Sequence, residues 1–223
     1  MTNETIILAS TAASIAFFHT LLGPDHYLPF VMLARARKWS MPKTLLVTFF
    51  CGAGHVLSSI LLGLIGIVLA VAVIKLETIE AMRGDFAAWM LIIFGFSYFV
   101  WGLHQLMRGK VHTHAHGHIG GGHHHGSIKK ETTSWTLFII FALGPCEPLI
   151  PLLMYPAARN SVFDLVLVTI VFGAVTILTM LGVVAVSTWG ISRIRVGVFE
   201  KYAHALSGLA IFLCGIAVKF LGL

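Results

Sequence analysis

The chain has 223 residues, of which 57% are hydrophobic and only 11% are charged. Soluble domains carry about 25% charged residues, so this composition excludes an ordinary soluble protein and predicts an all-α polytopic membrane protein. The net charge of +6 does not indicate nucleic-acid binding, because the basic residues are spread over short segments between apolar runs. The three cysteines lie within apolar runs, which argues against an extracellular disulfide framework.

Six segments are long and apolar enough to cross a bilayer, which takes about 20 residues. They are residues 6–33, 42–74, 86–107, 134–157, 162–190 and 203–222. The segments that follow the first, third and fifth spans hold 11 of the 15 lysines and arginines. Because positive charge accumulates on the cytoplasmic side, we expect a multi-pass protein of the cell inner membrane with both termini outside.

The two halves of the chain share a pattern. Residues 22–28 read LGPDHYL, and 121 residues later residues 143–149 read LGPCEPL. The same offset aligns the second predicted span with the fifth, and an offset of 113 aligns glycines of the third span with glycines of the sixth. Three spans is an odd number, so the second copy must cross in the opposite direction. We therefore predict two inverted three-helix repeats, residues 1–107 and 132–223, joined by a loop at 108–131, with the substrate bound at their interface.

The first span of each repeat contains a helix-breaking pair, Gly23-Pro24 in one copy and Gly144-Pro145 in the other. Proline removes a backbone donor and disrupts the preceding turn. The carbonyls that are freed are tolerated in a membrane only inside protein or beside water. Transporters built from inverted repeats commonly use such broken helices to form the substrate site.

Ionisable side chains gather at the two breaks and in the second span. Such residues cost about 2.5–3.5 kcal/mol each on insertion scales, so they usually mark a pathway or a proton relay. The predicted metal ligands are His19, Asp25, His26, His55, Cys146 and Glu147. Two alternatives stay open at this point, namely Glu147 as a proton carrier and Cys146 as a small apolar filler.

The types of predicted ligand limit which metal ions the site could bind. Imidazole suits zinc, copper, iron and nickel, and thiolate favours the softer of these ions. A mixed site predicts nickel or cobalt, with zinc as a further candidate, and it allows proton coupling because the ligands must be deprotonated. Ser58, Thr176 and Thr179 are predicted secondary contacts, since Thr176 and Thr179 align with His55 and Ser58.

The loop at 108–131 is rich in glycine and histidine. Such a segment cannot form a packed core and is typical of a metal-binding tract. We expect it to gather or sense metal in the cytoplasm. Its histidines are His112, His114, His116, His118, His123, His124 and His125.

Two stretches of the first half resemble a known group of transporters. The spacing of His19, Asp25 and His26 in HTLLGPDH is similar to the first-span signature of the nickel/cobalt transporter superfamily, particularly its hydrogenase and urease accessory permeases. Thr20 stands where that signature has a proline. GAGHVLSSI, which contains His55, resembles the second-span motif of the same superfamily. The resemblance implies transport of nickel or cobalt.

The second half contains a different resemblance. GPCEPLIP is similar to the Pro-Cys helix of DsbD-type transmembrane thiol oxidoreductases, which share the inverted three-span repeat. Those proteins use one cysteine in each repeat, whereas the matching position in the first repeat of this chain is Asp25. Thiol-disulfide electron transfer is therefore the alternative to metal transport.

Taken together, the sequence predicts a transporter of a divalent transition metal and not an enzyme. We expect membrane lipid and the metal ion as its partners, no nucleic acid and no permanently bound cofactor. The further alternatives are an accessory permease or sensor that needs a metallochaperone or another subunit, and a carrier of an anion or organic solute.

Overall fold

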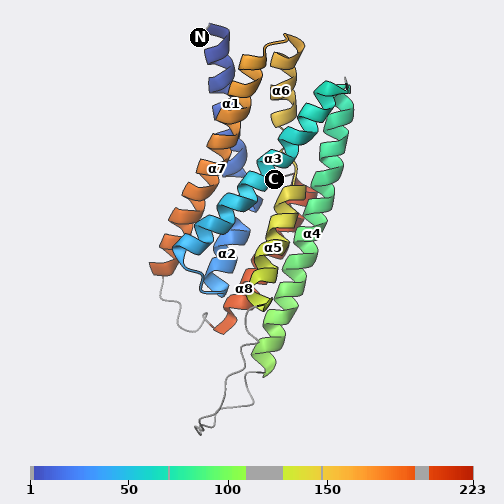
Figure 1. Cartoon of the computed structure of the whole chain (residues 1–223). Helices are drawn as coiled ribbons and strands as arrows, with labels where there is room; N and C mark the ends of the chain where they lie inside the picture. Colours follow the sequence, from blue (N-terminus) through green and yellow to red (C-terminus); the bar gives the residue numbers. More distant parts are fainter. Residues whose placement is uncertain (1–2, 70, 109–127, 147, 194–200, 223) are drawn as a thin grey trace.

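The computed structural model describes residues 3–69, 71–108, 128–146, 148–193 and 201–222, without the side chains of 128–132. Every regular element in this part of the chain is a helix (Figure 1). The elements are α1 (Asn3–Leu22), η1 (Pro24–His26), α2 (Leu28–Ala36), α3 (Met41–Val68), α4 (Val73–Arg108), α5 (Ile128–Leu143), α6 (Leu149–Ala158), α7 (Val162–Arg193) and α8 (Ala203–Leu221).

Five of the described helices, α1, α3, α4, α7 and α8, are long and apolar enough to cross a membrane. Many large apolar side chains point outward, as expected for a surface that faces lipid; Phe50 is 55% exposed and Leu178 is 66% exposed. The polytopic helical class predicted from composition is therefore correct.

The fourth predicted span is divided at the break that the Gly144-Pro145 pair predicted, so it is not among the five described helices that are long enough to cross a membrane. Residues 134–157 form two shorter apolar helices, α5 and α6, on either side of Gly144, Pro145 and Cys146. Pro145 has no N–H to continue the hydrogen-bond ladder, so α5 ends just before it. The first predicted span is divided in the same way, because α1 ends at Leu22 and α2 begins at Leu28 after the short turn η1.

The third predicted span also begins earlier than expected. Helix α4 starts at Val73 rather than at residue 86, so Lys75 and Arg83 lie in a helix and not in a loop. The charged residues of this first part of α4 lower its hydropathy. A prediction based on hydropathy alone therefore starts the span too late, at residue 86.

The helices pack in pairs that bring the two halves of the chain together (Figure 1). Helix α1 lies along α7, α5 lies along α3, and α4 lies along α8. The α4–α8 pair is the closest, because glycines on each helix face the backbone of the other. Small residues allow this approach in membranes, where dispersion contacts rather than the hydrophobic effect hold helices together.

Two apolar clusters fill the interior. One contains Phe30, Leu137 and Met180 together with Cys51 and Cys214. The other joins α1, α6 and α7, and its buried residues are Ala12, Ala16, Cys146, Leu149, Leu153, Val168 and Phe172. The second break therefore lies in the packed interior at Cys146, and in the first break Gly23 and His26 are buried.

Candidate metal centre

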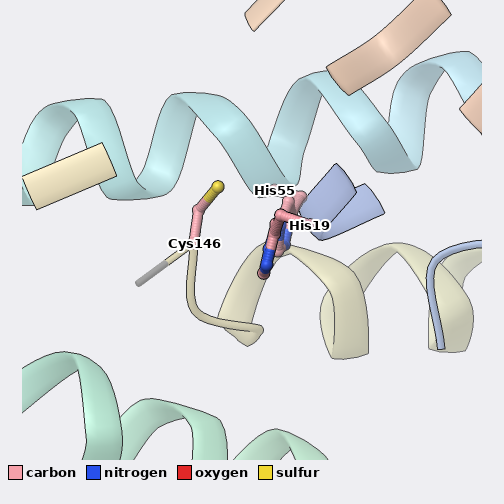
Figure 2. A group of neighbouring side chains, drawn as sticks. All are labelled: His19, His55 and Cys146. Carbon is pink, nitrogen blue, oxygen red and sulfur yellow. The ribbon is translucent and has the colours of Figure 1, made fainter. Parts of the chain in front are cut away.

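Three side chains from three different helical segments meet at the breaks. His19 is near the end of α1, His55 is in the middle of α3, and Cys146 follows α5 (Figure 2). One ligand atom from each lies within 4.8 Å of the other two. His55 is 3% exposed and Cys146 is fully buried. Two imidazoles and one thiol at this separation form a candidate site for a transition-metal ion.

The orientation of His55 suits a ligand. Its Nδ1 lies 3.3 Å from the carbonyl oxygen of Phe141, and a carbonyl only accepts, so Nδ1 carries the proton and donates. The proton on Nδ1 leaves a lone pair on Nε2. Nε2 is buried and has no hydrogen-bond partner among the described residues. A buried lone pair held in this way is what a metal-binding histidine presents.

His26 is adjacent to this group. Its Nδ1 lies 3.1 Å from Oδ1 of Asp25 and 3.3 Å from the carbonyl oxygen of Gly23. Its ring centroid lies 4.9 Å from that of His19 and 5.2 Å from that of His55. Both contacts of Nδ1 are with acceptors, so Nδ1 carries a proton, and Nε2 of His26 has no partner within the described part of the chain.

Cys146 is placed by the backbone. Its N–H donates to the hydroxyl oxygen of Ser59 on α3, 3.2 Å away. All three cysteines lie in the described residues, and no disulfide joins any of them. Cys51 and Cys214 belong to a different apolar cluster from Cys146. The site therefore contains one cysteine, and the structure does not bring a second thiol to it.

A cavity of about 560 Å³ borders the site, between the breaks and the helices α4 and α8. Its polar lining consists of His19, Asp25, His26, His55, Asp85 and Lys219. Asp85 and Lys219 form an ion pair between α4 and α8. Four of the six predicted metal ligands, three histidines and the carboxylate of Asp25, therefore line one cavity.

The remaining predicted residues fall into three groups. Glu147 and the seven loop histidines lie outside the described residues. Ser58 supports the site from outside, since its Oγ donates to the carbonyl oxygen of His55. Thr176 and Thr179 lie on α7; Thr176 is fully buried, and neither is part of the His-Cys group.

The turn around Gly23 leaves no room for a side chain. A methyl group there would lie 2.6 Å from Nδ1 of His26 and 2.9 Å from Oδ1 of Asp25. We predict that Gly23→Ala displaces His26 and lowers zinc affinity by about 10- to 100-fold, the range found when groups that orient ligands are disturbed. A zinc titration of the purified protein measures this.

Gly190→Ala is the matched control, because a methyl group at Gly190 meets nothing within 4 Å. Equal zinc affinity in the two variants would show that the turn at Gly23 does not position the site.

An ion pair in α4 was missed by the sequence analysis. Glu80 is fully buried, and its Oε1 accepts a 2.8 Å hydrogen bond from Arg83. Arg83 also donates to Ser58 and to backbone oxygens of the Gly144-Pro145 break. The i,i+3 spacing of a glutamate and an arginine was the available signal, but both were assigned to a loop.

Residues 28–217 match the family model described as "Cytochrome C biogenesis protein transmembrane region". This finding agrees with the resemblance of the Pro-Cys segment, and nothing in the comparisons supports the resemblance to nickel/cobalt transporters. No curated protein and no solved structure matches the chain. Because the match covers most of the chain, the protein belongs to the family of the cytochrome c biogenesis protein transmembrane region.

Proposed function

We propose that this membrane protein binds a transition-metal ion between its two broken helices and passes it across the membrane. The observation that carries the proposal is the convergence of His19, His55 and Cys146 within 4.8 Å. Ionisable side chains inside a membrane protein are costly and usually functional. Buried imidazole lone pairs beside a thiol fit a metal ion better than an organic solute.

The donor set narrows the choice of ion. Two nitrogen ligands and one sulfur ligand suit zinc and copper, and they also accept nickel and cobalt. The carboxylate of Asp25 is hydrogen-bonded to His26 and is not part of the three-residue group. Among the predicted ions we therefore favour zinc over nickel and cobalt, and we add copper as a candidate.

The cavity supports a route by which a metal ion could reach the His-Cys group. Asp25 and His26 line it, and the ring of His26 lies next to both histidine ligands. In this proposal an ion enters the cavity, contacts His26 and then reaches His19, His55 and Cys146. Because the ligands bind metal only when deprotonated, uptake is expected to fall at low pH.

Metal uptake into proteoliposomes tests the proposal. We expect saturable flux of at least one of zinc, copper, nickel and cobalt, abolished in His26→Ala and in Cys146→Ser. His104→Ala is the control, because His104 is an exposed histidine on α4. Absence of flux for all four ions in the wild-type protein would contradict the proposal.

The proposal includes the arrangement of the chain in the membrane. We infer two inverted repeats, 1–107 and 132–223, with termini outside and the histidine-rich loop in the cytoplasm. The pairing of α1 with α7 and of α5 with α3 supports this, since each pair is the image of the other under the repeat alignment.

A second candidate function is thiol-disulfide electron transfer, and the family match favours it. The comparisons support this function better than metal transport, whereas the geometry supports metal binding better. In this alternative the thiolate of Cys146 would attack a disulfide of a partner protein, which forms a mixed disulfide and releases the partner's other sulfur as a thiolate. The resolving thiol would belong to the partner, because the structure places neither of the other cysteines in the cluster of Cys146.

The redox state of Cys146 separates the two functions. In a chain carrying Cys51→Ser and Cys214→Ser, electron transfer predicts that part of Cys146 is recovered from cells as a mixed disulfide after acid quenching. Complete recovery of Cys146 as a thiol, together with metal flux, would exclude electron transfer.

A further inference from the structure

The helix break at Gly144-Pro145 leaves backbone carbonyls without helical partners. Helix α5 ends at Leu143, and the N–H of Cys146, which would pair with the carbonyl of Ala142 in a continuing helix, donates to Ser59 instead. Gly144 donates to the carbonyls of Ile140 and Phe141, which leaves the oxygens of Ala142 and Gly144 for other donors. In broken transporter helices such oxygens commonly coordinate hard cations.

Here the guanidinium of Arg83 occupies both oxygens. Nη2 of Arg83 lies 3.1 Å from the carbonyl oxygen of Ala142 and 3.5 Å from that of Gly144. The side chain of Arg83 is 19% exposed, and Glu80 beside it has no exposed surface. The ion pair with Glu80 balances the charge of Arg83 inside the protein.

The packing of α4 brings Arg83 to the break. A methyl group at Gly84 would lie 2.8 Å from Cγ of Pro145, so only glycine lets α4 approach this closely. The next residue after Pro145 is the ligand Cys146. The guanidinium therefore contacts the segment that carries the thiol.

The same nitrogen also reaches the helix that carries His55. Nη2 of Arg83 donates to Oγ of Ser58 at 2.8 Å, and that hydroxyl donates to the carbonyl oxygen of His55 at 2.9 Å. One side chain thus links α3 to the segment before Cys146. A guanidinium is planar and has several donors in a rigid fork, which suits it to hold several acceptors at once.

We propose that Arg83 is a positioning and specificity-determining residue, which fixes Cys146 opposite His55 and removes the carbonyl oxygens of Ala142 and Gly144 from the ligand set. The proposal rests on the proposed metal site. Because two potential oxygen ligands are occupied, the ion meets nitrogen and sulfur donors, and the site discriminates against hard cations that need oxygen.

Competition between a soft and a hard ion tests this. In full-length protein, cobalt bound to a thiolate gives a near-ultraviolet charge-transfer band, which reports on Cys146 and not on the histidine-rich loop. Displacement of this band by zinc and by manganese gives the zinc-to-manganese selectivity. We expect Arg83→Gln to lower this ratio by about 10- to 100-fold. Arg83→Lys, which keeps the charge but not the fork, should lie between Arg83→Gln and the wild type.

Arg159→Gln is the matched control, because Arg159 pairs with the exposed Glu4, away from the break. A general loss of stability would lower the affinity for both ions together, whereas the proposal requires the ratio to change. An unchanged ratio in Arg83→Gln, or the same change in Arg159→Gln, would overturn it. If Arg83→Gln does not fold, the intermediate ratio of Arg83→Lys decides the question.

A measurement without metal separates this proposal from the proposed function. The rate of Cys146 alkylation in metal-free protein, read by mass spectrometry of its peptide, should rise at least about 10-fold in Arg83→Gln, the size expected when hydrogen bonds from a charged donor are lost. Absence of the cobalt band in wild-type protein would contradict the metal function, and an increased alkylation rate in that case would still support positioning by Arg83. An unchanged alkylation rate beside normal wild-type metal binding would overturn the positioning role alone.

Discussion

Replacing His55 by alanine is expected to lower metal affinity by more than about 100-fold, since loss of a ligand exceeds the cost of disturbing a group that orients one. His55 presents an Nε2 lone pair because its Nδ1 donates to the carbonyl of Phe141. The cobalt charge-transfer band of the purified full-length protein measures the effect. The band itself should disappear in Cys146→Ser.

His104→Ala serves as the control for this experiment. His104 is also a histidine in a spanning helix, but it is exposed and lies outside the His-Cys group. The His104→Ala variant should bind cobalt with the same affinity as the wild-type protein. If His55→Ala retained wild-type affinity and remained folded by circular dichroism, His55 would not be a ligand and the proposed centre would be wrong.

Gly208→Ala in α8 is expected to destabilise the protein by about 3 kcal/mol or more, at the upper end of the range for overpacked cores. A methyl group at Gly208 would overlap the backbone of Phe99 in α4. Backbone cannot move aside as a flexible side chain does, so the two helices would have to separate. Thermal unfolding of the purified protein in detergent measures the change.

Gly182→Ala in α7 provides the comparison, since a methyl group there meets nothing within 4 Å. Alanine is a better helix former than glycine by about 1 kcal/mol, so this variant should be as stable as the wild type or more stable. Similar unfolding temperatures for Gly208→Ala and Gly182→Ala would show that the close approach of α4 and α8 is not needed for stability.

Glycines of α4 and α8 contact the opposite helix in a reciprocal way. Gly95 faces Phe212, and Gly208 faces Phe99. The offset of 113 residues that aligns Gly95 with Gly208 also aligns Phe99 with Phe212. This reciprocity is what a two-fold relation between α4 and α8 would produce, and it supports the proposed inverted repeats.

Part of this structure could be predicted from the sequence because its causes are local. Runs of apolar residues determine which segments can be membrane helices, and Gly-Pro pairs determine where two of those segments are interrupted. The sequence also predicted that six candidate ligands would share one central volume, and the structure groups three of them, His19, His55 and Cys146. Their role in metal binding stays a prediction.

Other features depend on partners that are distant along the chain. Hydropathy assigned Glu80 and Arg83 to a loop, because two charges in an apolar context look unfavourable until their partners are known. In the folded protein each charge neutralises the other, and Arg83 finds acceptors 59 and 61 residues away. The separation of Cys51 and Cys214 from Cys146 likewise follows from how the helices pack.

The sequence by itself thus determined the membrane class, the broken helices and the candidate ligands, since these follow from composition and from the backbone chemistry of glycine and proline. Only the tertiary structure decided that the ring of His26 lies beside those of His19 and His55, that Cys146 has no second thiol in its cluster, and that Arg83 reaches the second break. Those outcomes depend on which side chains face one another across helices, and that is settled by packing between distant segments.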